Sequence, residues 1–114
     1  MNRRGEAARR VDRPEPGFFE VRLVKGGPLV AASIAFDVDT GMWTATIDGD
    51  AGLPDPDPWQ AEGLTRVWHY GRAVTEDEYR YRLALKTWAL ANDPAHPAAH
   101  PRDPINVNTL ATPF

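Results

Sequence analysis

The sequence predicts an α+β domain: a three- or four-stranded antiparallel meander with one helix packed across a face and an extended C-terminal tail. Apolar and polar residues alternate through much of residues 18–48, which is typical of half-buried strands, and two turn sequences interrupt the alternation. Only residues 75–92 carry a full set of helix start, body and stop signals. We divide the chain into a flexible basic arm, residues 1–16, and a single α+β domain, residues 17–114.

The strands are expected at residues 18–25, 29–36 and 42–48. The sequence Gly26-Gly27-Pro28 separates the first two, and a glycine there can supply the positive φ that a hairpin turn needs. Gly41 is the expected left-handed residue of the second turn. Three strands joined in sequence by short turns form an antiparallel meander.

The predicted helix begins at Thr75, which serves as N-cap, and Glu78 completes a capping box with it. It ends at Asn92, which suits a left-handed cap, because Pro94 prevents the chain from continuing as a helix. At about 100° per residue, one apolar stripe is the expected core face, and its members are Tyr81, Ala84, Leu85, Trp88 and Ala91.

A second apolar stripe lies on the opposite side of this helix and consists of Tyr79, Leu83 and Leu90. One interpretation is that the C-terminal tail covers it, or that it is a tolerable exposed patch. The other is a partner-binding or self-association surface, since Arg80, Arg82 and Lys86 flank it as basic residues often flank interfaces.

The other segments have weaker patterns. Residues Asp48–Gly63 are rich in Asp, Pro and Gly and are expected to form an exposed loop with Trp59 as its anchor. A short strand is expected at Leu64–Tyr70. Prolines make residues 93–104 an irregular connector, and residues 104–114 are expected to be an extended segment that packs on an apolar surface.

Charge is distributed unevenly. The first 25 residues contain seven basic and four acidic side chains, whereas the rest contains six basic and twelve acidic ones. No Lys or Arg occurs at residues 26–65, which favours either a solvated acidic loop or an acidic surface that attracts a basic protein partner. The candidate partner-binding residues are Asp37, Asp39, Asp48, Asp50, Asp55, Asp57, Trp59 and Glu62.

The arm offers an alternative surface. Its arginines are either part of a solvated tail or contacts to nucleic acid or to an acidic partner. Because no aromatic residue lies between them, stacking on single-stranded nucleic acid is disfavoured. The candidate nucleic-acid contacts are Arg3, Arg4, Arg9 and Arg10.

Catalytic and cofactor motifs are not found. The absence of cysteine excludes thiol catalysis, and the only serine, Ser33, lies within a predicted strand, where a nucleophile elbow cannot form. Three Asp-x-Asp pairs could supply oxygen ligands to Ca²⁺ or Mg²⁺, but their setting favours turns. Pro97 prevents His96 and His100 from sharing a helix face. We expect no enzyme, metal or cofactor, and, without a signal or membrane segment, a cytoplasmic protein that does not bind membranes.

The segments GFFEVRLVKGGPLVAASI, GMWTATIDG, YGRAVTEDEYRYRLALKTWA and PAAHPRDPINVNTL together resemble small uncharacterised proteins encoded by phages and prophages of proteobacteria. The resemblance spans about residues 17–110 and implies a phage accessory context. We therefore expect a non-enzymatic protein–protein binding module, as a phage accessory or anti-defence protein, that engages a basic partner through its acidic loop. The alternatives are a nucleic-acid-associated protein that uses the arm and a homo-oligomeric structural protein, a homodimer for example.

Overall fold

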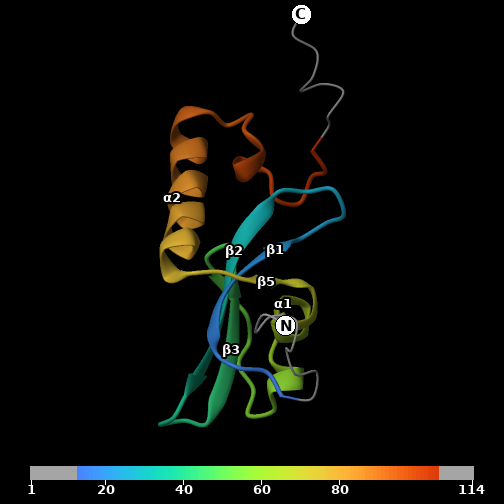
Figure 1. The fold of residues 1–114 in the computed structure, drawn as a ribbon, viewed down its shortest axis with the longest axis vertical. Helices are drawn as coiled ribbons and strands as arrows, with labels where there is room; N and C mark the ends of the chain where they lie inside the picture. The colour runs from blue at the N-terminus through green and yellow to red at the C-terminus, as the bar shows by residue number, and fades with distance from the viewer. Residues whose placement is uncertain (1–12, 106–114) are drawn as a thin grey trace, which may run out of the picture.

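A computed structural model describes residues 13–105, and its architecture is the predicted α+β class. Three antiparallel strands form the predicted meander, and a two-residue strand extends it at each edge in the order β4-β3-β2-β1-β5 (Figure 1). The strand bounds are β1 Gly17–Arg22, β2 Leu29–Asp37, β3 Met42–Ile47, β4 Asp50–Ala51 and β5 Arg72–Ala73. The meander strands were predicted to within a few residues, and Gly26 and Gly41 have the positive φ expected of the turns.

The main core lies between the sheet and a short helix, α1 (Leu64–Tyr70). The prediction of a strand here was wrong. Leu64, Val67 and Trp68 are buried, at the i, i+3, i+4 spacing that places side chains on one helix face. The N-cap Gly63 has φ 83°, a left-handed conformation that turns the chain into α1 at little steric cost.

The side chains that face α1 come from alternate positions of the meander. Phe19 of β1 lies opposite Ala32 of β2, and Ile34 of β2 lies opposite Ala45 of β3. All four are buried in one cluster with α1, and Phe19 meets Trp68 edge to face at 6.0 Å. This side of the sheet is therefore the apolar one.

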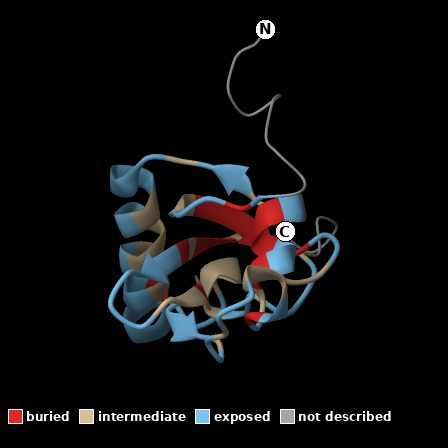
Figure 2. Cartoon of the chain, turned by 90° about the horizontal axis from the view of Figure 1, so that it is seen from below, coloured by how far each residue is buried: buried red, intermediate tan, exposed pale blue. Residues whose placement is uncertain are grey.

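The long helix α2 (Glu76–Asn92) packs on the opposite face of the sheet (Figure 1). It begins as predicted, with the Thr75 hydroxyl accepting from the Glu78 amide at 3.1 Å. It also ends at Asn92, but the predicted left-handed cap is wrong, because Asn92 does not have positive φ. Its side-chain amide instead donates to the Trp88 carbonyl at 3.1 Å. In Figure 2 the buried residues gather in the middle of the sheet, whereas α2 is mostly exposed or intermediate.

The predicted core face of α2 was the wrong face. Trp88 is 50% exposed and Tyr81 is 61% exposed, and Ala84 and Ala91 are exposed as well, so only Leu85 of that stripe is half-buried. The side chain of Tyr79 turns to the sheet instead, where its ring lies 4.8 Å from that of Phe18.

Ion pairs, which a hydrophobicity pattern does not report, fix this orientation of α2. Arg82 Nε donates to Glu20 Oε2 at 2.7 Å, and Arg72 of β5 donates to Glu20 Oε1 at 2.7 Å. Lys86 Nζ lies 3.0 Å from Asp48 Oδ2 and donates to the Asp48 carbonyl at 2.8 Å. The burial of Glu20 raises its pKa, but the hydrogen bonds and charges of Arg82 and then Arg72 outweigh this, so its pKa is lowered overall.

The acidic loop follows the free edge of β3 more closely than the sequence suggests. Gly52 N–H donates to the Ala45 carbonyl at 2.8 Å, and Asp55 exchanges backbone hydrogen bonds with Trp43 at 2.9 and 3.1 Å. The alternating prolines lack N–H donors and so leave the outer edge of this segment unfit for further strand pairing. A 3₁₀ turn, η2 (Pro58–Gln60), then leads to α1.

The connector after α2 has more structure than predicted. It contains a 3₁₀ turn, η3 (Pro97–Ala99), and ends where Ile105 N–H donates to the Gly26 carbonyl at 2.8 Å. It thus ties the end of α2 to the β1–β2 turn. The predicted extended tail lies outside the described residues, except for its first two positions. No helix within residues 13–105 is long and apolar enough to cross a membrane.

Candidate functional site

The acidic segment that sequence analysis treated as one surface divides into two groups. The residues of the first group lie at the end of the sheet where β2 turns into β3 (the lower end in Figure 1), and they are Asp37, Asp39, Asp55 and Asp57. Those of the second lie at the other end of β3 or next to it, and they are Asp48, Asp50 and Glu62. The division follows from the register, because Asp37 pairs with Met42 and Asp55 pairs with Trp43, one residue along.

The second group faces cations. Asp48 is buried and paired with Lys86, so we leave it out of the surface that we consider for partner binding. Asp50 and Glu62 line a shallow cavity of about 280 Å³, together with Arg66 and Arg102. Cations from outside the acidic segment therefore offset this end of it.

The first group is organised by turns. Asp37 Oδ1 accepts from the Asp39 amide at 2.8 Å, Asp55 Oδ1 from the Asp57 amide at 2.9 Å, and Asp57 Oδ1 from the Trp59 amide at 3.0 Å. These are side-chain-to-backbone bonds two residues on, so two of the Asp-x-Asp pairs form Asx turns. Within residues 13–105, no ion pair joins these four carboxylates to a cation. In three of these residues one carboxylate oxygen thus accepts a hydrogen bond from the backbone. The negative charge of all four carboxylates remains available to a partner.

Apolar side chains lie among these carboxylates. Val38 is 82% exposed and Phe36 is 40% exposed, and the Phe36 ring lies 5.0 Å from that of Trp43. Leu53 is 73% exposed too, but its backbone is hydrogen-bonded to Glu62 of the second group. Phe36 is the last residue of the strand predicted at residues 29–36, and this part of β2 extends beyond the main core. We call this end of the sheet the hairpin-end patch, made of Phe36, Asp37, Val38, Asp39, Asp55 and Asp57. The pairing register places Phe36 and Asp55 on the same face as Trp43, and Asp37 on the opposite face, so the patch wraps around the end of the sheet.

Trp59, also predicted to bind a partner, is held by the fold. It is half-buried against the main core, and its ring stacks on that of His69 at 5.6 Å and 23°. The Asp57 carboxylate caps the 3₁₀ turn that carries it. Trp59 therefore anchors the loop, as its isolation in a polar segment predicted.

The second predicted surface does not exist as one face. Tyr79 and Leu83 are half-buried, and only Leu90 is exposed. What α2 presents to solvent is the stripe with Tyr81 and Trp88. Arg3, Arg4, Arg9 and Arg10 lie outside the described residues, so the nucleic-acid interpretation stays a prediction.

Residues with catalytic or metal-binding chemistry are dispersed. Ser33 lies within β2, and His69 stacks on Trp59. His96 Nδ1 accepts from the Ala98 amide at 3.0 Å, which makes it a cap of η3. In the part of the chain that the structure describes, no group of three or more His, Asp and Glu side chains could hold a metal ion.

Comparisons of the chain with protein-family models, with curated proteins and with solved structures give no match.

Proposed function

We propose that this protein is a non-enzymatic protein-binding module that engages a basic partner through the hairpin-end patch. The observation that carries the proposal is the meeting of exposed apolar side chains with aspartates that no described cation neutralises. The further proposal of a phage accessory or anti-defence role rests only on the resemblance of the sequence.

The composition of the patch supports a protein partner. Phe36 and Val38 offer apolar area whose burial contributes about 25 cal/mol per Å². The aspartates around them attract Lys and Arg and repel acidic partners, which accelerates association and adds specificity. A basic amphipathic segment fits both properties.

The rigidity of the patch is a second support. Backbone hydrogen bonds between Asp55 and Trp43 attach the loop to β3, and Asx turns fix the carboxylates of Asp37 and Asp55. A surface that is ordered before binding loses less conformational entropy when a partner docks.

The test uses a panel of amphipathic peptides of equal length whose net charge runs from negative to strongly positive, with binding measured by fluorescence anisotropy. The diagnostic variant changes the four aspartates of the patch to asparagine, which keeps the side-chain oxygen that accepts the turn hydrogen bonds and removes the charge. We expect affinity to rise with positive peptide charge, to fall with added salt, and to fall at least tenfold in the variant.

A second variant serves as a matched control. It carries four acidic-to-amide changes at exposed positions away from the patch, Asp77→Asn, Glu78→Gln, Asp93→Asn and Asp103→Asn, so its net charge equals that of the diagnostic variant. It should bind as the wild type does. An equal loss of affinity in both variants would show that the overall charge of the protein, and not the patch, controls binding. The absence of binding by every basic peptide would refute the proposal.

A further inference from the structure

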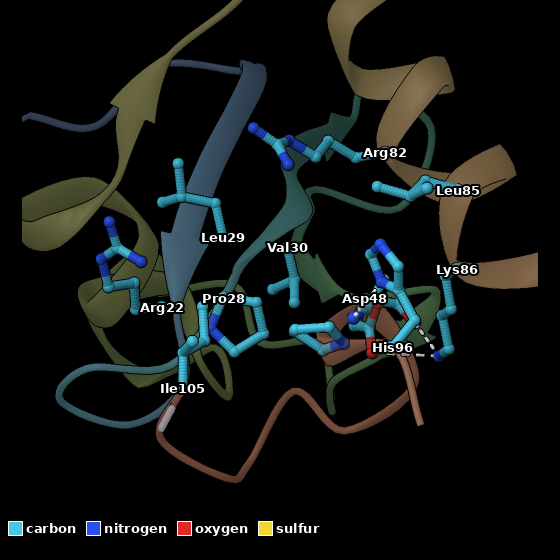
Figure 3. Close-up of a pocket in the computed structure, with 12 residues that line it drawn as sticks. Arg22, Pro28, Leu29, Val30, Asp48, Arg82, Leu85, Lys86, His96 and Ile105 are labelled. Carbon is cyan, nitrogen blue, oxygen red and sulfur yellow. Dashed lines mark hydrogen bonds and ion pairs between the residues drawn. The ribbon is translucent and has the colours of Figure 1, made fainter. Parts of the chain in front are cut away.

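A cavity of about 260 Å³ lies at the other end of β3, away from the hairpin-end patch. Figure 3 shows the residues that line it. Its walls come from α2, from the start of β2, and from the connector that follows α2. The hydrogen bond between Ile105 and Gly26 holds the connector across this end of the sheet. At about 30 Å³ per water, its volume corresponds to roughly nine waters, which suits a small organic molecule.

The cavity is rich in positive charge. Arg22, Arg82 and Lys86 line it, against a single carboxylate, Asp48, so its lining has a net charge of +2 when His96 is neutral. This contrasts with a chain whose net charge is −3. Low-dielectric walls strengthen the attraction of such a site for an anion.

Several donors of these groups are available to a ligand. Lys86 Nζ uses two of its three protons on Asp48, and Arg82 uses its Nε proton on Glu20. Within the described residues, no bond takes the protons on the terminal nitrogens of Arg82. Because His96 Nδ1 accepts from the Ala98 amide, a neutral His96 ring carries its proton on Nε2, which makes that nitrogen a donor too.

The remaining lining is apolar. Leu29 and Val30 of β2 and Leu85 of α2 contribute aliphatic side chains, and Pro28 and Pro97 add their rings. A ligand that uses the whole cavity therefore needs an apolar body and an anionic group. Bare inorganic anions would use only the charged part.

We propose that this cavity binds a small organic anion, a carboxylate or phosphate monoester with an apolar body, between Arg82 and Lys86 of α2 and the aliphatic side chains at the start of β2. The site is independent of the hairpin-end patch, because the two lie at opposite ends of β3.

The probes are benzoate, phenyl phosphate, inorganic phosphate and neutral benzamide, titrated into the ¹⁵N-labelled protein and followed by amide chemical shifts. We expect benzoate or phenyl phosphate to shift amides of residues 28–30, 82–86 and 96–98. Benzamide should bind at least tenfold more weakly than benzoate, and inorganic phosphate more weakly than phenyl phosphate. The better of the two organic anions identifies the anionic group.

Two variants probe the site without removing the main core. Lys86→Gln should weaken binding at least tenfold, whereas Arg80→Gln, on the same helix but 72% exposed and outside the cavity lining, should leave it within twofold. Ala98→Leu should fill the cavity and abolish binding without a change of charge. Far-UV circular dichroism verifies that each variant is folded.

The proposal is overturned if neither organic anion shifts the lining amides, or if benzamide binds as tightly as benzoate. Equal effects of Lys86→Gln and Arg80→Gln would overturn it too, since they would show that a remote charge acts as strongly as the lining one. Undiminished binding to Ala98→Leu would place the ligand elsewhere.

Discussion

Glu20→Gln tests how α2 is held on the sheet. The Glu20 side chain is 2% exposed, and its two oxygens accept from Arg82 and Arg72, each at 2.7 Å. Glutamine has nearly the same shape, but it carries no charge and offers one acceptor where the carboxylate offers two. The substitution therefore removes an electrostatic link between β1, β5 and α2 with little change of volume.

The expected cost follows from the exposure of each arginine. A hydrogen bond to a charged group contributes about 1.5–3 kcal/mol when desolvated, and Arg82, 28% exposed, lies near that limit. Arg72 is 66% exposed, so its bond is worth about 0–1 kcal/mol. We expect Glu20→Gln to lower the free energy of unfolding by about 2–3 kcal/mol, below the roughly 3–5 kcal/mol of a fully buried broken pair.

The assay is urea denaturation followed by tryptophan fluorescence, with Glu76→Gln as the matched control. Glu76 pairs with Arg80 on the exposed side of α2, so the same chemical change there should have a far smaller effect. Arg82→Gln should also cost more than Arg72→Gln. A loss below about 0.5 kcal/mol for Glu20→Gln, or equal losses for the two glutamates, would refute the reasoning.

The stabilisation that Glu20 provides should depend on pH. The pKa of Glu20 is lowered in the folded protein, since its bonds to the arginines outweigh the opposing effect of burial. Its contribution is therefore complete above the ordinary value of 4.5 and is lost as the pH falls from there through the lowered pKa. The stability difference between wild type and Glu20→Gln should therefore shrink only as the pH falls below 4.5. A difference that already shrinks above pH 5 would contradict a lowered pKa of Glu20.

Three further pairs of substitutions test the fold by the same denaturation assay. Trp68→Ala should cost about 3–5 kcal/mol because Trp68 is buried against the sheet, whereas Trp88→Ala should cost less than half of that; equal losses would contradict the orientation of α2. Gly63→Ala should be more destabilising than Gly49→Ala. Both glycines have positive φ, but only a Cβ at position 63 would meet an isoleucine of β3, at 3.1 Å. The opposite order of stabilities would contradict the described start of α1. Asp48 has φ 56°, a left-handed conformation that asparagine tolerates better than alanine. Asp48→Ala should therefore cost about 1 kcal/mol more than Asp48→Asn. Equal costs would contradict this backbone conformation of Asp48.

Local signals in the sequence were sufficient for the meander and for α2. Alternation along β1, β2 and β3 and the cap at Thr75 depend on neighbouring residues, and each was predicted to within a few positions. The strand predicted at Leu64–Tyr70 failed because seven residues are too few to separate two periods: Val67, Trp68 and Tyr70 suggested a strand, while Leu64, Val67 and Trp68 form the helical face.

The candidate site was predicted only in part, because a list of acidic residues says nothing of their partners in space. Asp48 looked like Asp55 in the sequence, but Lys86, 38 residues away, neutralises Asp48. Phe36 belongs to the predicted second strand, but β2 extends past the core there and leaves Phe36 40% exposed. Both outcomes depend on contacts between distant segments, which periodicity does not encode.

The two faces of the sheet explain why the orientation of α2 was missed. β1 presents Phe19 and Val21 to α1, and Phe18 and Glu20 to α2, so the apolar face receives the short helix and the mixed face receives the long one. A rule that turns the most apolar stripe of a helix toward the sheet assumes an apolar sheet face. Here the sheet face carries a carboxylate, and Arg82 and Lys86 turn toward the sheet with Tyr79, which leaves Trp88 partly exposed.

The same arrangement creates the basic cavity. Because α2 directs cations at the sheet, the space next to the Lys86–Asp48 pair, where the connector closes over the start of β2, is lined by those cations and by aliphatic side chains. In the acidic segment, which contains no cation of its own, Lys86 of α2 pairs with Asp48, whereas no described ion pair reaches the aspartates of the hairpin-end patch. The orientation of one helix therefore separates a positive cavity from a negative patch along β3, and the proposed ligand and partner follow from that separation.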